Sequence, residues 1–338
     1  MGAQDIEYVE LYTGDERSVV EYFVSSFGFT RIAESAGDSS HSLLLRQGSV
    51  QIVVTAGRGT EGFLEAHGDG VADIAFACDD VNEAFETAVA AGASAIRSEP
   101  HTQAVSGLFG AHHTLVARSA GSRLPVGRTW APLPQSPVRP AGHIRLLDHV
   151  AVVVEGGTLV GAADYYTSAF GLPRYSDEYV EIGEQGLDSI VVRSPSGGIT
   201  FTILEQDQAK KPGQLEGFLA RYGGPGVQHL AFGVDDIVSA VRDYGDRGID
   251  FLSTPRAYYD MLVERLPGVR AEIADLRETN VLADRDEWGY LLQLFTRSPY
   301  QRNTMFYELL QRRGARGFGG ANIRALYEAV ERDGLAAG

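Results

Sequence analysis

Three side chains in the C-terminal half of the sequence have the types and the spacing of metal ligands. His149 lies in the apolar stretch "LDHVAVVV", His229 in "VQHLAFGV" and Glu308 in "NTMFYELLQRR". Separations of 80 and 79 residues imply that each side chain comes from a different strand. A buried carboxylate without a partner is costly, and a divalent cation shared with two imidazoles would remove that cost. Two imidazoles and one carboxylate on one face of a metal leave three positions open, as in non-haem Fe(II) oxygenases.

Each of these residues also has an ordinary structural interpretation. A single histidine in a strand is more often a hydrogen-bonded core residue than a ligand, and Glu308 could pair with Arg312, four residues further on. The adjacent His112 and His113 offer a second, weaker candidate metal site, and the remaining histidines look incidental. Two histidines at matching positions of a repeat, together with one buried glutamate, favour the metal site.

The repeat is visible in two nearly identical phrases, "GDGVADIAFACDDV" (68–81) and "GPGVQHLAFGVDDI" (224–237). Their alignment places Asp73 opposite His229, and alignment of the openings of the two halves places Tyr8 opposite His149. The second half therefore has histidine at both positions and the first half at neither. We infer a duplicated fold in which only the second half carries a metal site.

The elements that position these residues can be predicted from periodicity. Each half opens with a short apolar strand and an amphipathic helix, and continues through strands with period-2 alternation. The duplicated phrase supplies a further strand, which leads into helices at about 80–92 and 235–248. The pattern predicts an α+β protein of four β-α-β-β-β modules that form two open-barrel domains.

A proline-rich stretch separates the halves. Five of the 13 prolines lie in residues 119–145, which predicts a semi-extended linker. We expect a metal-free domain at 1–120, a linker at 121–145 and a catalytic domain at 146–338.

Composition excludes several classes of function. The 338 residues carry a net charge of −16 and show no basic patch, so nucleic acid is not an expected partner. No apolar run approaches the length of a membrane helix, and the N-terminus lacks the features of a secretory signal. The lone Cys78 excludes an intramolecular disulfide framework and a CxxC metal site. We expect a soluble, cytoplasmic protein without a membrane or nucleic-acid partner.

Several motifs together resemble the 4-hydroxyphenylpyruvate dioxygenase family of the vicinal-oxygen-chelate superfamily. They are "DHV", "GVQHLAF", "GYLLQLFTR", "FYELLQR" and "GFGGANIRALYEAVER". The resemblance spans the second half closely and the first half more loosely. It implies the glyoxalase-like fold, Fe(II) as the cofactor, and 4-hydroxyphenylpyruvate and O2 as substrates. It leaves the oligomeric state open, with a homo-oligomer as one option.

The resemblance also implies a set of pocket residues. His149, His229 and Glu308 would hold the iron, and Phe295 and Phe318 would flank the substrate ring. A C-terminal helix would form a lid, with Gly317, Gly319 and Gly320 permitting its movement and Phe318 and Ile323 sealing the pocket. The implied substrate-binding set is Ser189, Thr202, Leu204, Gln214, Gln228, Gln293, Phe295, Phe318, Asn322 and Ile323.

Three positions depart from the pattern of the homogentisate-forming members of the family. Thr202 and Leu204 stand where those members have proline and asparagine, and Ile323 stands where they have phenylalanine. All three departures resemble the members that make 4-hydroxymandelate, which the family uses for hydroxyphenylglycine in peptide antibiotics. We therefore expect 4-hydroxymandelate and CO2 as products. The alternatives are a homogentisate-forming dioxygenase and, more distantly, a metal-free binding protein of the same fold.

Overall fold

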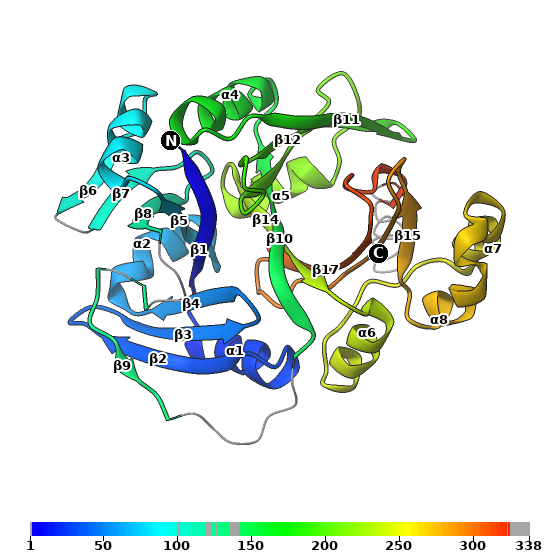
Figure 1. Ribbon diagram of the computed structural model, residues 1–338, viewed down its shortest axis with the longest axis horizontal. Coiled ribbons are helices and arrows are strands. Elements are labelled where there is room, and N and C mark those ends of the chain that lie inside the picture. The colour runs from blue at the N-terminus through cyan, green and yellow to red at the C-terminus, as the bar shows by residue number, and fades with distance from the viewer. Residues whose placement is uncertain are drawn as a thin grey trace.

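Two mixed β-sheets, each formed by one half of the chain, make up the protein (Figure 1). The computed structural model describes residues 2–99, 102–118, 124–125, 127–134, 142–322 and 324. Each sheet combines two β-α-β-β-β modules, so the predicted α+β fold of four modules is confirmed. The second sheet curls into an open half-barrel (Figure 1).

The first sheet has the strand order β6-β7-β8-β5-β1-β4-β3-β2-β9. Its two modules meet where β1 pairs antiparallel with β5. The first-half elements are β1 (Ala3–Tyr12), α1 (Glu16–Glu21), the π-helix η1 (Tyr22–Ser26), β2 (Thr30–Ala36), β3 (His41–Gln47), β4 (Val50–Ala56), η2 (Arg58–Thr60), α2 (Glu61–His67), β5 (Gly70–Cys78), α3 (Val81–Ala90), β6 (Ala95–Glu99), β7 (Thr102–Ser106), β8 (His112–Ala117) and β9 (Ala131–Pro132).

The second sheet has the order β11-β12-β13-β10-β14-β17-β16-β15 and repeats this plan, with β10 antiparallel to β14 at its centre. Helices α7 and α8 are additions that lie beside β15 (Figure 1). The second-half elements are β10 (Ile144–Val154), α4 (Leu159–Phe170), β11 (Arg174–Ile182), β12 (Gln185–Arg193), β13 (Thr200–Gln206), α5 (Gln214–Tyr222), β14 (Gly226–Val234), α6 (Ile237–Asp246), α7 (Arg256–Arg265), η3 (Pro267–Glu272), α8 (Ile273–Glu278), β15 (Leu282–Arg285), β16 (Tyr290–Phe295) and β17 (Phe306–Arg313).

The duplicated Asp-Asp dipeptides have the same structural role in both halves. The second aspartate of each pair begins the helix that follows the strand, because its carboxylate accepts a hydrogen bond from a backbone N–H of the first turn. Asp80 Oδ1 accepts from Glu83 N at 3.0 Å, and Asp236 Oδ1 accepts from Ser239 N at 3.1 Å. The aspartates are therefore capping residues and belong to the scaffold.

A shared apolar core fixes the two halves against each other. Phe27 from the first half packs edge-on against Phe232, Tyr244 and Tyr307 of the second, with ring centroids 5.2–6.0 Å apart. His113 stacks on Phe76 and its Nε2 lies 2.8 Å from the Tyr166 hydroxyl oxygen. Both ring nitrogens of His113 therefore have hydrogen-bond partners in the core, which argues against the second candidate metal site at His112 and His113.

The segment between the halves is more than a spacer. Its residues Ala131–Pro132 form β9 and pair with β2. Arg128 enters the first sheet, where its Nη2 lies 2.8 Å and its Nη1 3.0 Å from the two carboxylate oxygens of Glu10. The same Nη1 donates to Ser42 Oγ at 2.8 Å. Part of the expected linker therefore belongs to the first domain, to which it adds a strand and the side chain of Arg128. The exact domain boundaries stay a prediction.

No helix in the described part of the chain is long and apolar enough to cross a membrane.

Candidate metal centre

Three strands of the half-barrel bring the predicted ligands together. His149 lies on β10, His229 on β14 and Glu308 on β17, and their ligand atoms all lie within 4.8 Å of one another. Glu308 Oε2 lies 3.3 Å from His149 Nε2 and 3.2 Å from His229 Nε2. Glu308 is 1 % exposed. A buried carboxylate that faces two imidazole nitrogens is a donor set that fits a divalent metal.

The nitrogens on the far side of both imidazole rings face hydrogen-bond acceptors. His149 Nδ1 lies 2.9 Å from Asp148 Oδ1, and His229 Nδ1 lies 3.4 Å from Gln228 Oε1. An acceptor at Nδ1 keeps the proton there and leaves the Nε2 lone pair free for a metal. Both rings are therefore oriented as metal-binding histidines are.

Asp148 is itself held by a two-point ion pair. Arg312 Nε and Nη2 lie 2.7 and 2.8 Å from the two oxygens of Asp148. Arg312 thus pairs with Asp148, and the alternative in which it would neutralise Glu308 is wrong. A register shift between Leu147 and His149 lets Asp148 reach the same side of β10 as the histidine.

A second chain of hydrogen bonds supports Glu308. Gln293 Nε2 donates to Glu308 Oε1 at 2.6 Å, and Asn322 Nδ2 donates to Gln293 Oε1 at 2.8 Å. The Tyr258 hydroxyl, on α7, donates to Asn322 Oδ1 at 3.0 Å. The carboxylate of Glu308 is therefore connected to the C-terminal segment through the buried amides of Gln293 and Asn322.

The protonation states in the metal-free site follow from these contacts. Burial alone would lower the pKa of His149, but Glu308 and Asp148 outweigh it and raise this pKa to about 9. Burial would raise the pKa of Glu308, but the two histidines lower it to about 2. Burial lowers the pKa of His229. Without metal the site therefore balances one carboxylate against one imidazolium on His149.

The ligand atoms open into a cavity of about 200 Å³. It is lined by eight of the ten predicted substrate-binding residues, namely Ser189, Thr202, Leu204, Gln214, Gln228, Gln293, Phe295 and Phe318. Asn322 does not line the cavity but donates a hydrogen bond to Gln293, which does. Ile323 lies outside the described residues. Phe318 packs edge-on against His149 with ring centroids 5.2 Å apart, and Phe295 contacts His229 at 5.9 Å.

Sequence reasoning missed several lining residues. Phe306 stacks on His229 with ring centroids 4.9 Å apart and an interplanar angle of 24°. Its position two residues before Glu308 on β17 was a usable signal, because residues i and i+2 of a strand share a face. Ser176, Asp177 and Glu178 of β11 also line the cavity, and no motif in the sequence pointed to them.

The C-terminal glycines have a steric role that differs from the expected freedom of movement. Gly319 has φ +73°, and a Cβ there would lie 2.1 Å from Gln293 Oε1. A Cβ on Gly320 would lie 1.5 Å from Glu178 Oε1. A helical turn begins at 320, and the rest of the predicted lid helix lies outside the described residues. These glycines thus allow the backbone to approach the cavity wall, and movement of a lid stays a prediction.

The matched positions in the first half form a closed hydrogen-bonded set. Tyr8 on β1 and Asp73 on β5 occupy the registers of His149 and His229, and Thr114 on β8 occupies that of Glu308. Asp73 Oδ2 accepts from Tyr8 Oη at 3.2 Å and from Thr114 Oγ1 at 2.6 Å. Burial, with the nearby Glu10, raises the pKa of Asp73 to about 6. The first half therefore offers a satisfied polar cluster in place of metal ligands.

Comparisons with known proteins agree with this fold and site. Residues 1–119 match the model of the hydroxyphenylpyruvate dioxygenase N-terminal domain, and residues 148–262 match that of the glyoxalase/bleomycin resistance protein/dioxygenase superfamily. The chain is therefore a glyoxalase-type protein of the vicinal-oxygen-chelate class.

Whole-chain similarities narrow this class. The chain is 32% identical to 4-hydroxyphenylpyruvate dioxygenase of Yarrowia lipolytica, over 97% of this chain and 91% of that protein. It is 31% identical to the enzyme of the same name from Aspergillus fumigatus, over 97% and 92%. The chain belongs to the 4-hydroxyphenylpyruvate dioxygenase family.

A solved structure is more similar still. A triple-substitution variant of 4-hydroxymandelate synthase from Streptomyces coelicolor shares 50% identity with this chain. The TM-score is 0.91, and the match covers 98% of this chain and 99% of the other.

Proposed function

We propose that the protein is an Fe(II)-dependent dioxygenase that converts 4-hydroxyphenylpyruvate and O2 to 4-hydroxymandelate and CO2. The observation that carries the choice of product is the 50% identity to a 4-hydroxymandelate synthase over nearly the whole of both chains, against 29–35% for the relatives named as dioxygenases. The apolar Leu204 in the cavity wall supports the same choice.

The residues of the cavity have distinct roles in this proposal. His149, His229 and Glu308 hold Fe(II), which would supply the oxidative decarboxylation of a chelating α-keto acid. Asp148, itself held by Arg312, fixes the His149 ring through Nδ1, so that Nε2 faces the metal position. The phenyl rings of Phe295, Phe306 and Phe318 exclude water and orient the substrate ring, and Gln293 positions Glu308.

The direct test is product analysis. The protein is loaded with Fe(II) without oxygen, supplied with 4-hydroxyphenylpyruvate and then exposed to air, and the products are separated by chromatography. 4-Hydroxymandelate supports the proposal. Homogentisate would keep the iron site and overturn the choice of product. Failure of the protein to bind Fe(II) would favour the metal-free binding protein.

Selectivity between the two products is expected to depend on the cavity wall. The double variant Leu204→Asn with Ile323→Phe restores a polar partner and an aromatic surface, which should limit the tilt of the substrate ring and yield some homogentisate. A shift of about 1 Å is enough to change rates strongly. The ratio of the two products is the measurement, since it is insensitive to loss of total activity. Leu187→Asn, which adds the same amide elsewhere in the cavity, serves as the control and should leave mandelate as the product.

Metal binding is expected to release a proton. Because Glu308 and Asp148 raise the pKa of His149 to about 9, this ring is protonated in the metal-free protein at neutral pH and must lose its proton to bind metal. Metal affinity should therefore rise by about tenfold per pH unit up to about pH 9 and then level off. Anaerobic calorimetric titration at pH 7, in two buffers of different ionisation enthalpy, gives the number of protons released. A value of zero would contradict the assigned protonation state.

A further inference from the structure

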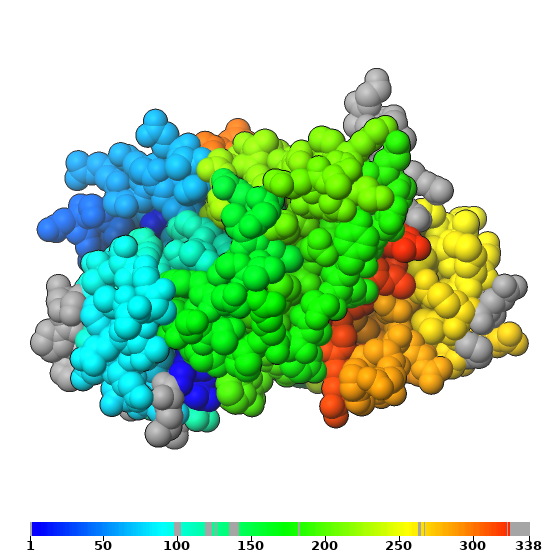
Figure 2. All heavy atoms as spheres, turned by 90° about the horizontal axis from the view of Figure 1, so that it is seen from above, coloured from blue at the N-terminus to red at the C-terminus, as the bar shows by residue number. Residues whose placement is uncertain are grey.

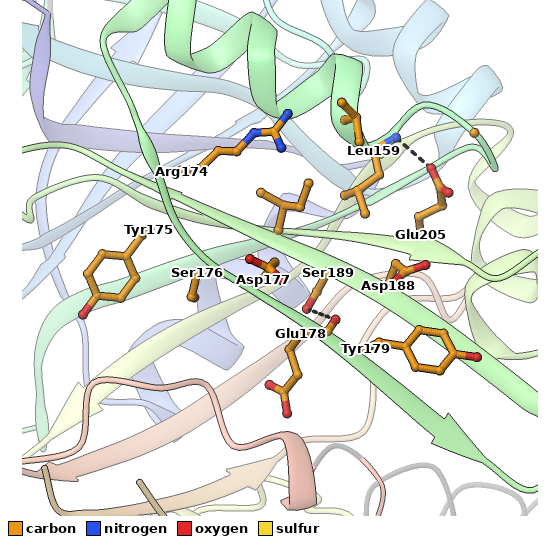
Figure 3. A pocket seen from close by; sticks show the side chains of 13 residues that line it. Leu159, Arg174, Tyr175, Ser176, Asp177, Glu178, Tyr179, Asp188, Ser189 and Glu205 are labelled. Carbon is orange, nitrogen blue, oxygen red and sulfur yellow. Dashed lines mark hydrogen bonds between the residues drawn. The ribbon is translucent and has the colours of Figure 1, made fainter. Parts of the chain in front are cut away.

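The cavity of about 200 Å³ beside His149, His229 and Glu308, which we call the metal cavity, adjoins two larger hollows that differ in the charges of their lining. The first, which we call the β11 hollow, has a volume of about 670 Å³ and shares Ser176, Asp177, Glu178 and Ser189 with the metal cavity. Figure 3 shows this hollow along β11 and β12, and Figure 2 shows the molecule from above, with β11 and β12 in green beside the red C-terminal segment. The second, the α5 hollow, has a volume of about 640 Å³ and shares Gln214, Gln228 and Phe306 with the metal cavity. Each hollow is thus separated from the metal cavity by the residues that the two share.

The charges of the two hollows have opposite sign. The β11 hollow is lined by one cationic side chain, Arg174, and by four carboxylates, which are Asp177, Glu178, Asp188 and Glu205 (Figure 3). The α5 hollow is lined by two cationic side chains, Arg221 and Arg297, and by one carboxylate, Asp250. An α-keto acid is an anion at neutral pH, and the whole chain carries a net charge of −16. A local cationic surface therefore matters for its approach.

Arg221 keeps its charge available in the α5 hollow. Its Nε donates to the backbone carbonyl of Asn303 at 3.2 Å, a neutral acceptor, and no ion pair of Arg221 is found among the residues that the structure describes. Arg297, in contrast, lies 3.4 Å from Asp250. Arg221 is therefore the cation of this hollow best able to attract an anion.

Buried polar atoms in the same hollow lack partners. Thr304 is 2 % exposed, and its Oγ1 has no hydrogen-bond partner within the described part of the chain. The Nε2 atom of Gln214, on the wall shared with the metal cavity, is in the same situation. Buried polar groups without partners are uncommon and cost free energy, so a hydroxyl and an amide in this state indicate a ligand-binding surface.

We propose that the α5 hollow is the port through which the keto acid reaches the metal cavity. Arg221 and Thr304 form a transient site for its carboxylate, and Gln214, Gln228 and Phe306 form the partition that it passes. This inference rests on the proposed function, since it takes 4-hydroxyphenylpyruvate as the substrate.

The first test uses charge. Association of 4-hydroxyphenylpyruvate with the full-length, Fe(II)-loaded protein is followed by stopped-flow spectroscopy without oxygen. Arg221→Gln should lower the association rate constant by about two- to fourfold at low ionic strength, and high salt should remove the difference. Arg174→Gln, which removes the same charge from the β11 hollow, is the matched control and should not slow association.

The second test uses size. Ser298→Phe places a ring in the α5 hollow away from the metal cavity, so association and dissociation should slow by the same factor while the Kd stays unchanged. Val160→Phe adds a ring to the β11 hollow and should change neither rate. A plug on the route acts on both rates alike, whereas damage to the binding site would change the Kd.

The outcomes separate the two proposals. Slower association in Arg221→Gln and Ser298→Phe, with the controls unaffected, supports the port. Slower association in Arg174→Gln or Val160→Phe alone would place entry at the β11 hollow and overturn it, as would four variants with wild-type rates. If wild-type protein binds Fe(II) but not the keto acid, the proposed function itself is wrong.

Discussion

Glu308→Gln is expected to abolish activity and to lower the affinity for a divalent metal by more than about 100-fold. Loss of a residue that only hydrogen-bonds to a metal ligand already costs about 10- to 100-fold, and loss of a ligand should cost more. The substitution keeps the shape of the side chain and removes its charge, so two imidazoles remain without the anionic ligand. An amide oxygen at this position can still accept the hydrogen bond from Gln293, so the fold should persist. Anaerobic calorimetry with Fe(II) measures the affinity, and circular dichroism checks the fold.

Thr114→Val is the control for this variant. Thr114 occupies the register of Glu308 in the first half and bonds Asp73, so its replacement disturbs a buried polar cluster without touching the metal cavity. Metal affinity should remain at the wild-type value. Retention of tight Fe(II) binding by Glu308→Gln would show that the third ligand has been assigned wrongly.

Arg128→Met is expected to lower the free energy of unfolding by about 3–5 kcal/mol, the cost of leaving a buried carboxylate without its partner. Glu10 is 2 % exposed, and Arg128 binds both of its carboxylate oxygens. Methionine keeps the aliphatic part of the side chain and removes the guanidinium. Denaturation with urea measures the loss.

Two further variants show whether the loss comes from the buried carboxylate. Arg118→Met removes an exposed arginine whose Nη1 lies 3.6 Å from Asp79, and it should cost at most about 1 kcal/mol. Adding Glu10→Gln to Arg128→Met should recover part of the stability, because no charge is then buried alone. Equal losses in Arg128→Met and Arg118→Met would mean that the linker arginine has no structural role.

The duplicated sequence pattern made the fold and the positions of the two candidate histidine ligands predictable, whereas Glu308 was indicated by its place as a carboxylate inside an apolar run. Each copy of the repeat places its residues in the same strand register, so Asp73 and His229 could be compared from the sequence alone. Apolar neighbours fixed which face of each strand is buried. The structure brings the two histidines together with Glu308.

Contacts that depend on local irregularity or on distant segments were not predictable. Strict alternation along β10 would place Asp148 on the opposite face from His149, and only the bulge next to it brings both to one side. The sequence showed that Arg312 lies four residues after Glu308 on the same strand face, but it did not show that Arg312 pairs with Asp148. Arg128 meets Glu10 across 118 residues of chain, and a proline-rich stretch gives no sign of such an insertion.

The position of β17 has a consequence for the order of events on the ribosome. This strand lies between β14 and β16 and carries Glu308, 79 residues after His229. At about 5–20 residues per second, translation needs about 4–16 s to cover that interval. During this time a nascent chain has both imidazoles, an uncovered β14 edge and no carboxylate to complete the donor set. Iron capture is therefore expected to follow insertion of β17, so that acquisition of the metal reports a finished half-barrel.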